Sequence, residues 1–159
     1  MDTRDGPLDT RVKDIVRSKS ALTDDGGVLT TVPTATVYEC IDRMVERDVG
    51  SIVVMEGETI AGIFTERDYM SSIALKGRSS ENTEVQAVMT SDVATVDPEK
   101  PLEECLQIMT ELRCRHLPVV QGDELVGLVS IGDCVKRIID TAQAETDRLR
   151  KYVTGTYPA

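Results

Sequence analysis

Two short segments of the chain combine a hydroxyl residue with an aspartate three positions later. The first pair is Thr65 and Asp68, the second is Ser130 and Asp133, and a glycine and two apolar residues precede each pair. A hydroxyl beside unpaired N–H groups at the start of a helix can bind an anion such as phosphate. The aspartate, one turn later, could accept hydrogen bonds from two vicinal hydroxyls, as a ribose offers. The glycine permits close approach of a backbone.

The same spacing has a purely structural interpretation. Ser/Thr-x-x-Asp before a helix is also a capping pattern, which satisfies the first N–H groups of the helix without any ligand. The presence of two copies does not decide between the interpretations, because a duplicated fold duplicates its helix caps. Both interpretations stay open from these residues alone.

Nucleophilic catalysis and metal binding have no signature in the chain. His116 is the only histidine, no cysteine pair is spaced C-x-x-C, and there is no Gly-x-Ser-x-Gly or Walker pattern. We therefore expect no catalytic residues, no metal site and no enzymatic activity. The cysteines are predicted to be reduced thiols that pack as small hydrophobic side chains: Cys40, Cys105, Cys114 and Cys134.

The segments that carry the two motifs recur at a shift of 65 residues. Residues 30–70 align without a gap with residues 95–135. A weaker match precedes each copy, where Val12-x-x-Ile15-Val16 resembles Val85-x-x-Val88-Met89. The offset between the two copies changes around Leu22–Gly27, where the first copy has extra residues. The Asp-Asp-Gly-Gly sequence there predicts a loop. The chain therefore contains an internal duplication.

Each copy predicts the same order of elements, β-α-β-β-α. A short strand near Thr30 or Thr95 precedes an amphipathic helix, a hairpin follows, and a second helix starts at about Glu66 or Ile131. In the first copy, the apolar stripe of the first helix consists of Val37, Cys40, Ile41, Met44 and Val45. One unit is too small to bury an adequate core, so the sheets should pack on each other. The predicted fold class is α+β, with pseudo-two-fold symmetry, two equivalent clefts and a C-terminal helix.

The predicted boundaries are repeat 1 at 10–76, a polar linker at 77–83, repeat 2 at 84–141, and a C-terminal helix and tail at 142–159. A long helix is expected over 132–152, with Gly155 and Pro158 as its stop. A tail beyond the compact unit suggests docking on a partner subunit, and a frayed terminus is the alternative.

Composition excludes several function classes. The chain has 159 residues, a net charge of −10 and 3% aromatic residues, which disfavours a nucleic-acid partner. No apolar run approaches the roughly 20 residues of a membrane span, and the polar first residues do not resemble a targeting signal. The sequence therefore predicts a cytoplasmic protein with no membrane partner.

The paired motifs, Gly62-Ile63-Phe64-Thr65-x-x-Asp68 and Gly127-Leu128-Val129-Ser130-x-x-Asp133, occur on two β-α-β-β-α units of this length. They resemble those of a tandem cystathionine β-synthase (CBS) domain pair, or Bateman module, over about residues 10–141. In that family the motif hydroxyl and aspartate hold the phosphate and ribose of an adenosine nucleotide.

The resemblance implies a set of ligand-binding positions. Thr30 and Thr95 fall where the family touches adenine or ribose, and backbone groups at Ile52 and Leu117 flank the adenine. The second copy alone carries a basic cluster before an apolar-Pro pair. In family members such residues steady phosphates, which implies a role for Arg115, His116 and the adjoining Pro118. Arg115 could instead be a solvated surface charge, and His116 a satisfied interface residue. This asymmetry predicts one favoured site.

These features favour a regulatory sensor that binds an adenine nucleotide (AMP, ADP or ATP, with NAD or S-adenosylmethionine possible) and has no obligatory cofactor. The ligand would act by shifting a conformational or oligomeric equilibrium. We expect a homodimer, with an effector protein that the sequence does not name. The alternative is a ligand-free dimerisation and interaction scaffold, in which the motif residues are plain caps.

Overall fold

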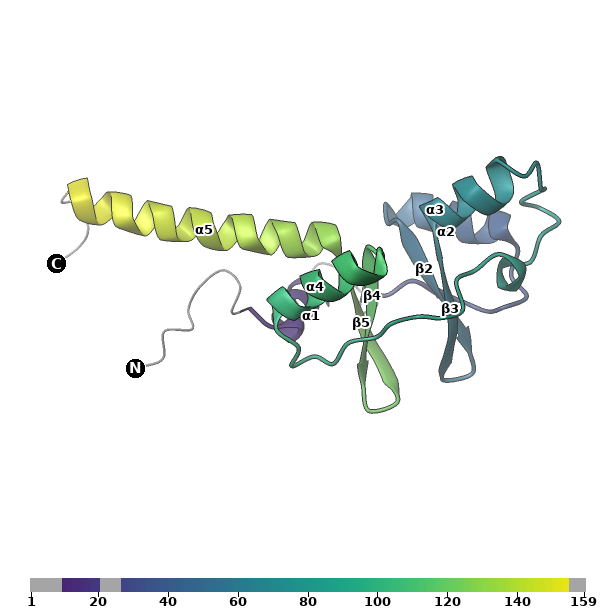
Figure 1. The fold of residues 1–159 in the computed structure, drawn as a ribbon, viewed down its shortest axis with the longest axis horizontal. Helices are drawn as coiled ribbons and strands as arrows, with labels where there is room; N and C mark the ends of the chain where they lie inside the picture. The colour runs from purple at the N-terminus through teal and green to yellow at the C-terminus, as the bar shows by residue number, and fades with distance from the viewer. Residues whose placement is uncertain (1–9, 21–26, 155–159) are drawn as a thin grey trace.

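The computed structural model describes residues 10–20 and 27–154 (Figure 1). The bounds of the elements, in chain order, are α1 (Val12–Ser20), β1 (Thr30–Thr31), α2 (Val37–Arg47), β2 (Ser51–Glu56), β3 (Thr59–Thr65), α3 (Glu66–Asp68), a π-helical segment (Tyr69–Ala74), a 3-10 turn (Val85–Ala87), α4 (Leu102–Leu112), β4 (His116–Gln121), β5 (Glu124–Ser130) and α5 (Ile131–Thr154). The mixed α+β content and the duplicated unit are confirmed. The predicted loop over residues 22–27 lies almost wholly outside the described residues, and the predicted helix stop beyond residue 154 lies entirely outside them.

Two sheets form the framework, with strand orders β1-β2-β3 and β4-β5. Both hairpins turn at a glycine with positive φ, +63° at Gly57 and +64° at Gly122, a conformation that disfavours side chains. The antiparallel register shifts at equivalent places in the two hairpins, between Val54 and Met55 and between residues 119 and 120. The duplication therefore preserves even the irregularities of the strands.

The short first strand differs between the copies. In the first copy β1 pairs in parallel with β2, and the Val53 N–H donates to the Leu29 carbonyl at 3.0 Å. The second copy has Pro118 in place of Val53, and proline has no N–H to donate. Only an isolated bridge between Val96 and Val119 remains there. The strand predicted near residue 95 is therefore reduced to this bridge.

The segment before each copy packs on the other copy. Val12 and Ile15 of α1 are buried in a core with Leu102 and Leu117, which belong to the second repeat. Conversely, Val85 and its neighbours complete the core of the first repeat. Figure 1 shows α1 beside β5, far along the chain from it. The two copies are therefore intertwined through these segments.

The sheets face each other through a small apolar layer. Val53 and Ile63 from the first sheet form one buried cluster with Leu128 from the second. The opposite face of the first sheet, which includes Phe64, packs on its own helices. This arrangement confirms two related units packed sheet to sheet.

The helices that follow the two motifs differ most between the copies. After β3, α3 is three residues long and continues as a π-helix to Ala74. After β5, α5 is one continuous helix of 24 residues that extends away from both sheets (Figure 1). On α2, Val45 is exposed, whereas Val37, Cys40 and Met44 are buried, so the buried stripe is narrower than the sequence predicts.

All four cysteines are free thiols, three of them buried and Cys114 half-buried. Burial raises the pKa of Cys105 to about 11 and that of Cys134 to about 12, so both stay protonated. Within residues 10–20 and 27–154, no group of histidine, cysteine and acidic residues could hold a metal ion. In that same part of the chain, no helix combines the length and apolar character that crossing a membrane requires.

Candidate functional site

The first motif forms a complete capping box. Thr65 Oγ1 accepts from the Asp68 N–H at 3.3 Å, and Asp68 Oδ2 accepts from the Thr65 N–H at 3.0 Å. The Thr65 hydroxyl also lies 3.1 Å from the same carboxylate oxygen. Both motif side chains are therefore engaged with each other at the start of α3.

The second motif repeats this geometry at the start of α5. Ser130 Oγ accepts from the Asp133 N–H at 3.1 Å, and Asp133 Oδ2 accepts from the Ser130 N–H at 2.9 Å. The capping bonds foreseen from the sequence are thus present in both copies. They place a hydroxyl and a carboxylate side by side where each strand ends, the arrangement that the binding interpretation also needs.

The two aspartates differ in the side chain from outside the motif that contacts each of them. The Thr90 hydroxyl donates to Asp68 Oδ1 at 3.2 Å, and the Thr90 backbone pairs with Ile63 on β3. On the second motif, Lys19 Nζ donates to Asp133 Oδ2 and to the Leu128 carbonyl, both at 2.9 Å. The first aspartate therefore has a neutral neighbour, whereas the second has a cation.

The sequence does not single out Lys19, although the structure places it at the second motif. It lies in the last turn of α1, near the start of the chain, and it reaches the second motif only because α1 crosses to that repeat. The match between residues 12–16 and 85–89 shows that the two segments are counterparts. The match does not show on which sheet each of these two segments packs.

His116 lies between the two motifs. A Cβ atom placed on Gly50 would be 3.5 Å from His116 Nε2 and 3.2 Å from Glu66 Oε1, so all three residues meet at one point. Glu66 lies within the first motif, between Thr65 and Asp68, and His116 pairs in register with Ser130 of the second. The histidine is therefore an interface residue, half-buried between the repeats.

The surroundings of His116 disfavour its charged form. Burial is the main cause that lowers its pKa from the usual 6.5, and the Lys19 ammonium and the Arg115 guanidinium lower it further. Asp133 and Glu66 oppose this shift with smaller effects than burial and Lys19. The imidazole is consequently neutral at pH 7 in this state.

The remaining predicted residues divide into two groups. The side chains of Ile52, Leu117 and Pro118 are buried in the interior, so only backbone groups at these positions could touch a ligand. Thr30 is half-buried, whereas Thr95 and Arg115 are exposed. The structure brings Thr65 together with Asp68, and brings Ser130, Asp133 and His116 together with Lys19. It gives no contact that tests the ligand role of the others.

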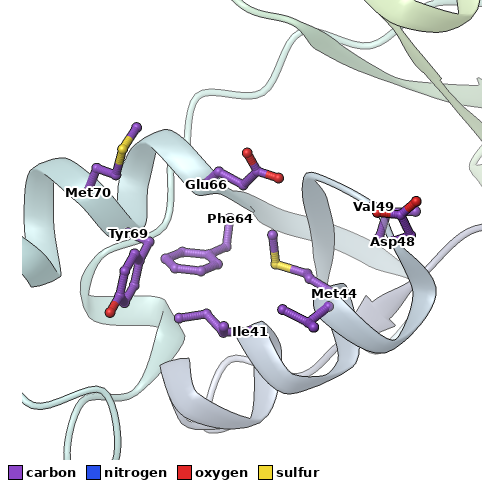
Figure 2. A pocket seen from close by; sticks show the side chains of 9 residues that line it. Ile41, Met44, Asp48, Val49, Phe64, Glu66, Tyr69 and Met70 are labelled. Atoms are coloured by element: carbon purple, nitrogen blue, oxygen red, sulfur yellow. The ribbon is translucent and has the colours of Figure 1, made fainter.

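A cavity of about 270 Å³ lies elsewhere, between α2 and α3 on the helix-covered side of β3 (Figure 2). Figure 2 shows the Phe64 ring between Tyr69 and Met44, with Ile41 below. The lining is mostly apolar, with Asp48 and Glu66 as its charged members. None of the eleven residues predicted to bind ligand lines this cavity.

The lowered pKa of His116 predicts a pH dependence of stability. The unfolded chain binds a proton near pH 6.5, whereas folded His116 binds it only at lower pH. Just below pH 6.5 the unfolded state therefore holds more protons, and the free energy of unfolding decreases as the pH falls, by at most about 1.4 kcal/mol per pH unit. Above this window the effect is absent. Urea unfolding between pH 5.5 and 7.5 measures it.

The matched control for this pH dependence is His116→Gln, because the chain has no other histidine. The variant should show a flatter profile in the same window. An unchanged profile would assign the dependence to other groups.

Comparison with known proteins places this architecture in a family. The family model of the CBS domain matches residues 12–75 and 85–140. The chain belongs to the CBS domain family. The resemblance inferred from the paired motifs is therefore confirmed, and the two matches are the two halves of a CBS pair.

Individual relatives agree over most of the chain. The CBS domain-containing protein CBSX3, mitochondrial, of Arabidopsis thaliana is 38% identical over 153 residues, which cover 93% of this chain and 74% of that protein. A solved structure of a CBS-domain protein from Burkholderia ambifaria MC40-6 is 42% identical, with a TM-score of 0.76, and the match covers 82% of this chain and 95% of that one. Both names describe CBS-domain proteins and not enzymes.

A hexameric CBS-CP12 protein from bloom-forming cyanobacteria has the same fold. It is 26% identical, with a TM-score of 0.69, and the match covers 79% of this chain and 66% of that one. Self-association therefore occurs among solved structures that share this fold.

Proposed function

We propose that this CBS pair is a regulatory sensor that binds an adenosine-containing nucleotide at its capped motifs. The observation that carries the proposal is the paired placement of a hydroxyl and a carboxylate at the ends of β3 and β5. A phosphate can accept from the hydroxyl and from the first N–H groups of the helix, and the carboxylate can accept from a ribose diol. Ligand binding would then replace bonds that the two side chains now make with each other.

The second motif is the better phosphate site. Lys19 Nζ lies 2.9 Å from Asp133 Oδ2, so a cation already stands beside the hydroxyl–carboxylate pair. His116 is close to the same groups, and a bound phosphate would favour its charged form. At the first motif, the corresponding neighbour of Asp68 is the neutral Thr90 hydroxyl, at 3.2 Å. This difference supports one favoured site, formed by Ser130, Asp133, Lys19 and His116.

The signal would pass through α1. Lys19 holds the end of this helix on the second repeat, while its ammonium pairs with Asp133. A phosphate that competes for the ammonium changes how α1 is held on the second repeat, and α1 precedes the strands of the first repeat in the chain. The ligand shifts this equilibrium only by its difference in affinity between the two states.

The proposal is tested by calorimetric titration of the full chain with AMP, ADP, ATP, NAD and S-adenosylmethionine, with adenosine as the phosphate-free control. We expect saturable binding of at least one nucleotide at one site per chain, and much weaker binding of adenosine. The absence of binding at millimolar concentration for every ligand would overturn the proposal.

The second candidate is a ligand-free scaffold, which the completed capping boxes favour because they leave the motif side chains already paired. In that case alanine substitutions in the motifs lower stability and alter no ligand response. The cytoplasmic location stays a prediction.

A further inference from the structure

The exposed side of α5 carries an apolar stripe with coiled-coil spacing. Its positions alternate by four and three residues: Val135, Ile139, Ala142, Thr146, Leu149 and Val153. The exposed fractions of its large members are 46% for Val135, 59% for Ile139, 57% for Leu149 and 83% for Val153. A shallow hollow lined by Thr146, Leu149, Arg150 and Val153 lies on this stripe. A partner helix would bury a surface of this kind in a regular seam.

The stripe is distinct from the side of α5 that packs on the molecule itself. Cys134 is buried in the core of the second repeat and Ile138 packs against it. At 100° per residue, the stripe lies roughly a quarter turn away from these two residues. From Ala142 onward all stripe positions are exposed. The core of the second repeat therefore does not cover the stripe, and Figure 1 shows this part of α5 projecting away from the sheets.

We propose that α5 pairs with α5 of a second copy of this chain as a short parallel coiled coil. The charges beside the seam identify the occupant. With Ile139 at heptad position a, Glu145 falls at position g and Arg150 at position e. A parallel pair places each g residue opposite the e residue five positions later on the partner, so Glu145 faces Arg150 of the partner subunit twice, by symmetry. The seam is thus complementary to itself.

An antiparallel pair loses this complementarity. In that orientation g positions face g positions and e positions face e positions, so the glutamate and the arginine no longer meet. The parallel arrangement also sets both CBS pairs at the same end of the coiled coil. The seam has three a and three d positions, so the dimer should be weak and dependent on concentration. This inference does not depend on nucleotide binding.

Cysteine cross-linking of the full chain tests the orientation. In a Cys114→Ser background, Leu149→Cys places a thiol at a d position, where a parallel pair brings the two copies within disulfide reach. Arg148→Cys, one residue away and outside the seam, is the matched control, and the other native thiols are buried. We expect Leu149→Cys to form the cross-linked dimer about tenfold faster than Arg148→Cys at equal concentration. Equal rates would overturn the proposal.

A charge exchange tests the partner. Sedimentation equilibrium should show that Glu145→Lys, and separately Arg150→Glu, weakens dimerisation roughly tenfold, because two attractive pairs become repulsive. The double variant should restore the wild-type dissociation constant. Residues five positions apart do not meet on one helix, so this rescue can arise only between chains. Additive losses in the double variant, or unchanged dimerisation in every variant, would contradict the parallel pairing of α5.

Discussion

Asp133→Ala is expected to abolish the nucleotide-dependent increase in the free energy of unfolding. For wild-type protein, a ligand at 100 times its dissociation constant raises this free energy by about 2.7 kcal/mol. Asp68→Ala should retain most of the increase. We expect the nucleotide at the second motif because Asp133 lies beside the Lys19 ammonium, which attracts a phosphate, whereas Asp68 lies beside the uncharged Thr90 hydroxyl.

The two aspartate variants control for each other. Each carboxylate accepts from the backbone N–H of the residue that precedes its helix, so each alanine removes half of a capping box and should lower the free energy of unfolding without ligand by about 1–3 kcal/mol. The nucleotide-dependent increase in the free energy of unfolding should be retained in Asp68→Ala and lost in Asp133→Ala. Thermal unfolding with and without nucleotide measures both quantities.

Lys19→Met gives an independent test of the same site. This variant keeps the length and apolar stem of the side chain but removes the cation from Asp133. It should weaken nucleotide binding and leave adenosine binding nearly unchanged. Two equal sites in the wild-type titration, or equal losses in Asp68→Ala and Asp133→Ala, would contradict the single favoured site.

Gly62→Ala and Gly127→Ala are each expected to destabilise the fold by about 1–3 kcal/mol through overpacking. A Cβ on Gly62 would lie 2.7 Å from the Thr90 carbonyl oxygen and 2.7 Å from Met89 Sδ. A Cβ on Gly127 would lie 2.7 Å from Val16 Cγ2. Both contacts come from the segment that precedes the other repeat. The substitutions therefore test the intertwined packing directly, by urea unfolding.

The two glycines should differ in how they can be rescued. The contacts of Gly127 are all with the Val16 side chain, so Val16→Ala should recover part of the loss in the double variant. For Gly62 one contact is a backbone oxygen, so Met89→Ala should recover little.

Gly132→Ala is the matched control for these substitutions. Its Cβ would meet only Ser130 Oγ, at an ordinary 3.7 Å, and the residue lies in α5, so alanine should be neutral or stabilising by up to about 1 kcal/mol. Equal effects of all three alanines would argue against close packing of the crossing segments.

The local features of this protein could be predicted from its sequence. The duplication, the two hairpins and the helices that follow Thr65 and Ser130 depend on patterns within a few residues, such as alternation of apolar positions, turn glycines and capping spacing. The CBS resemblance was readable for the same reason, because the paired motifs are short and contiguous. The length of α5 was foreseen to within two residues at each end.

Only the tertiary structure decided which copy each flanking segment completes. Lys19 and Asp133 are 114 positions apart, and their ion pair depends on α1 crossing to the second sheet. Self-similarity shows that residues 12–16 and 85–89 are equivalent, but either could pack on either sheet with similar burial of apolar area. The pKa of His116 likewise depends on the tertiary structure, because burial and the Lys19 ammonium of α1 lower it whereas Asp133 of α5 and Glu66 of α3 raise it.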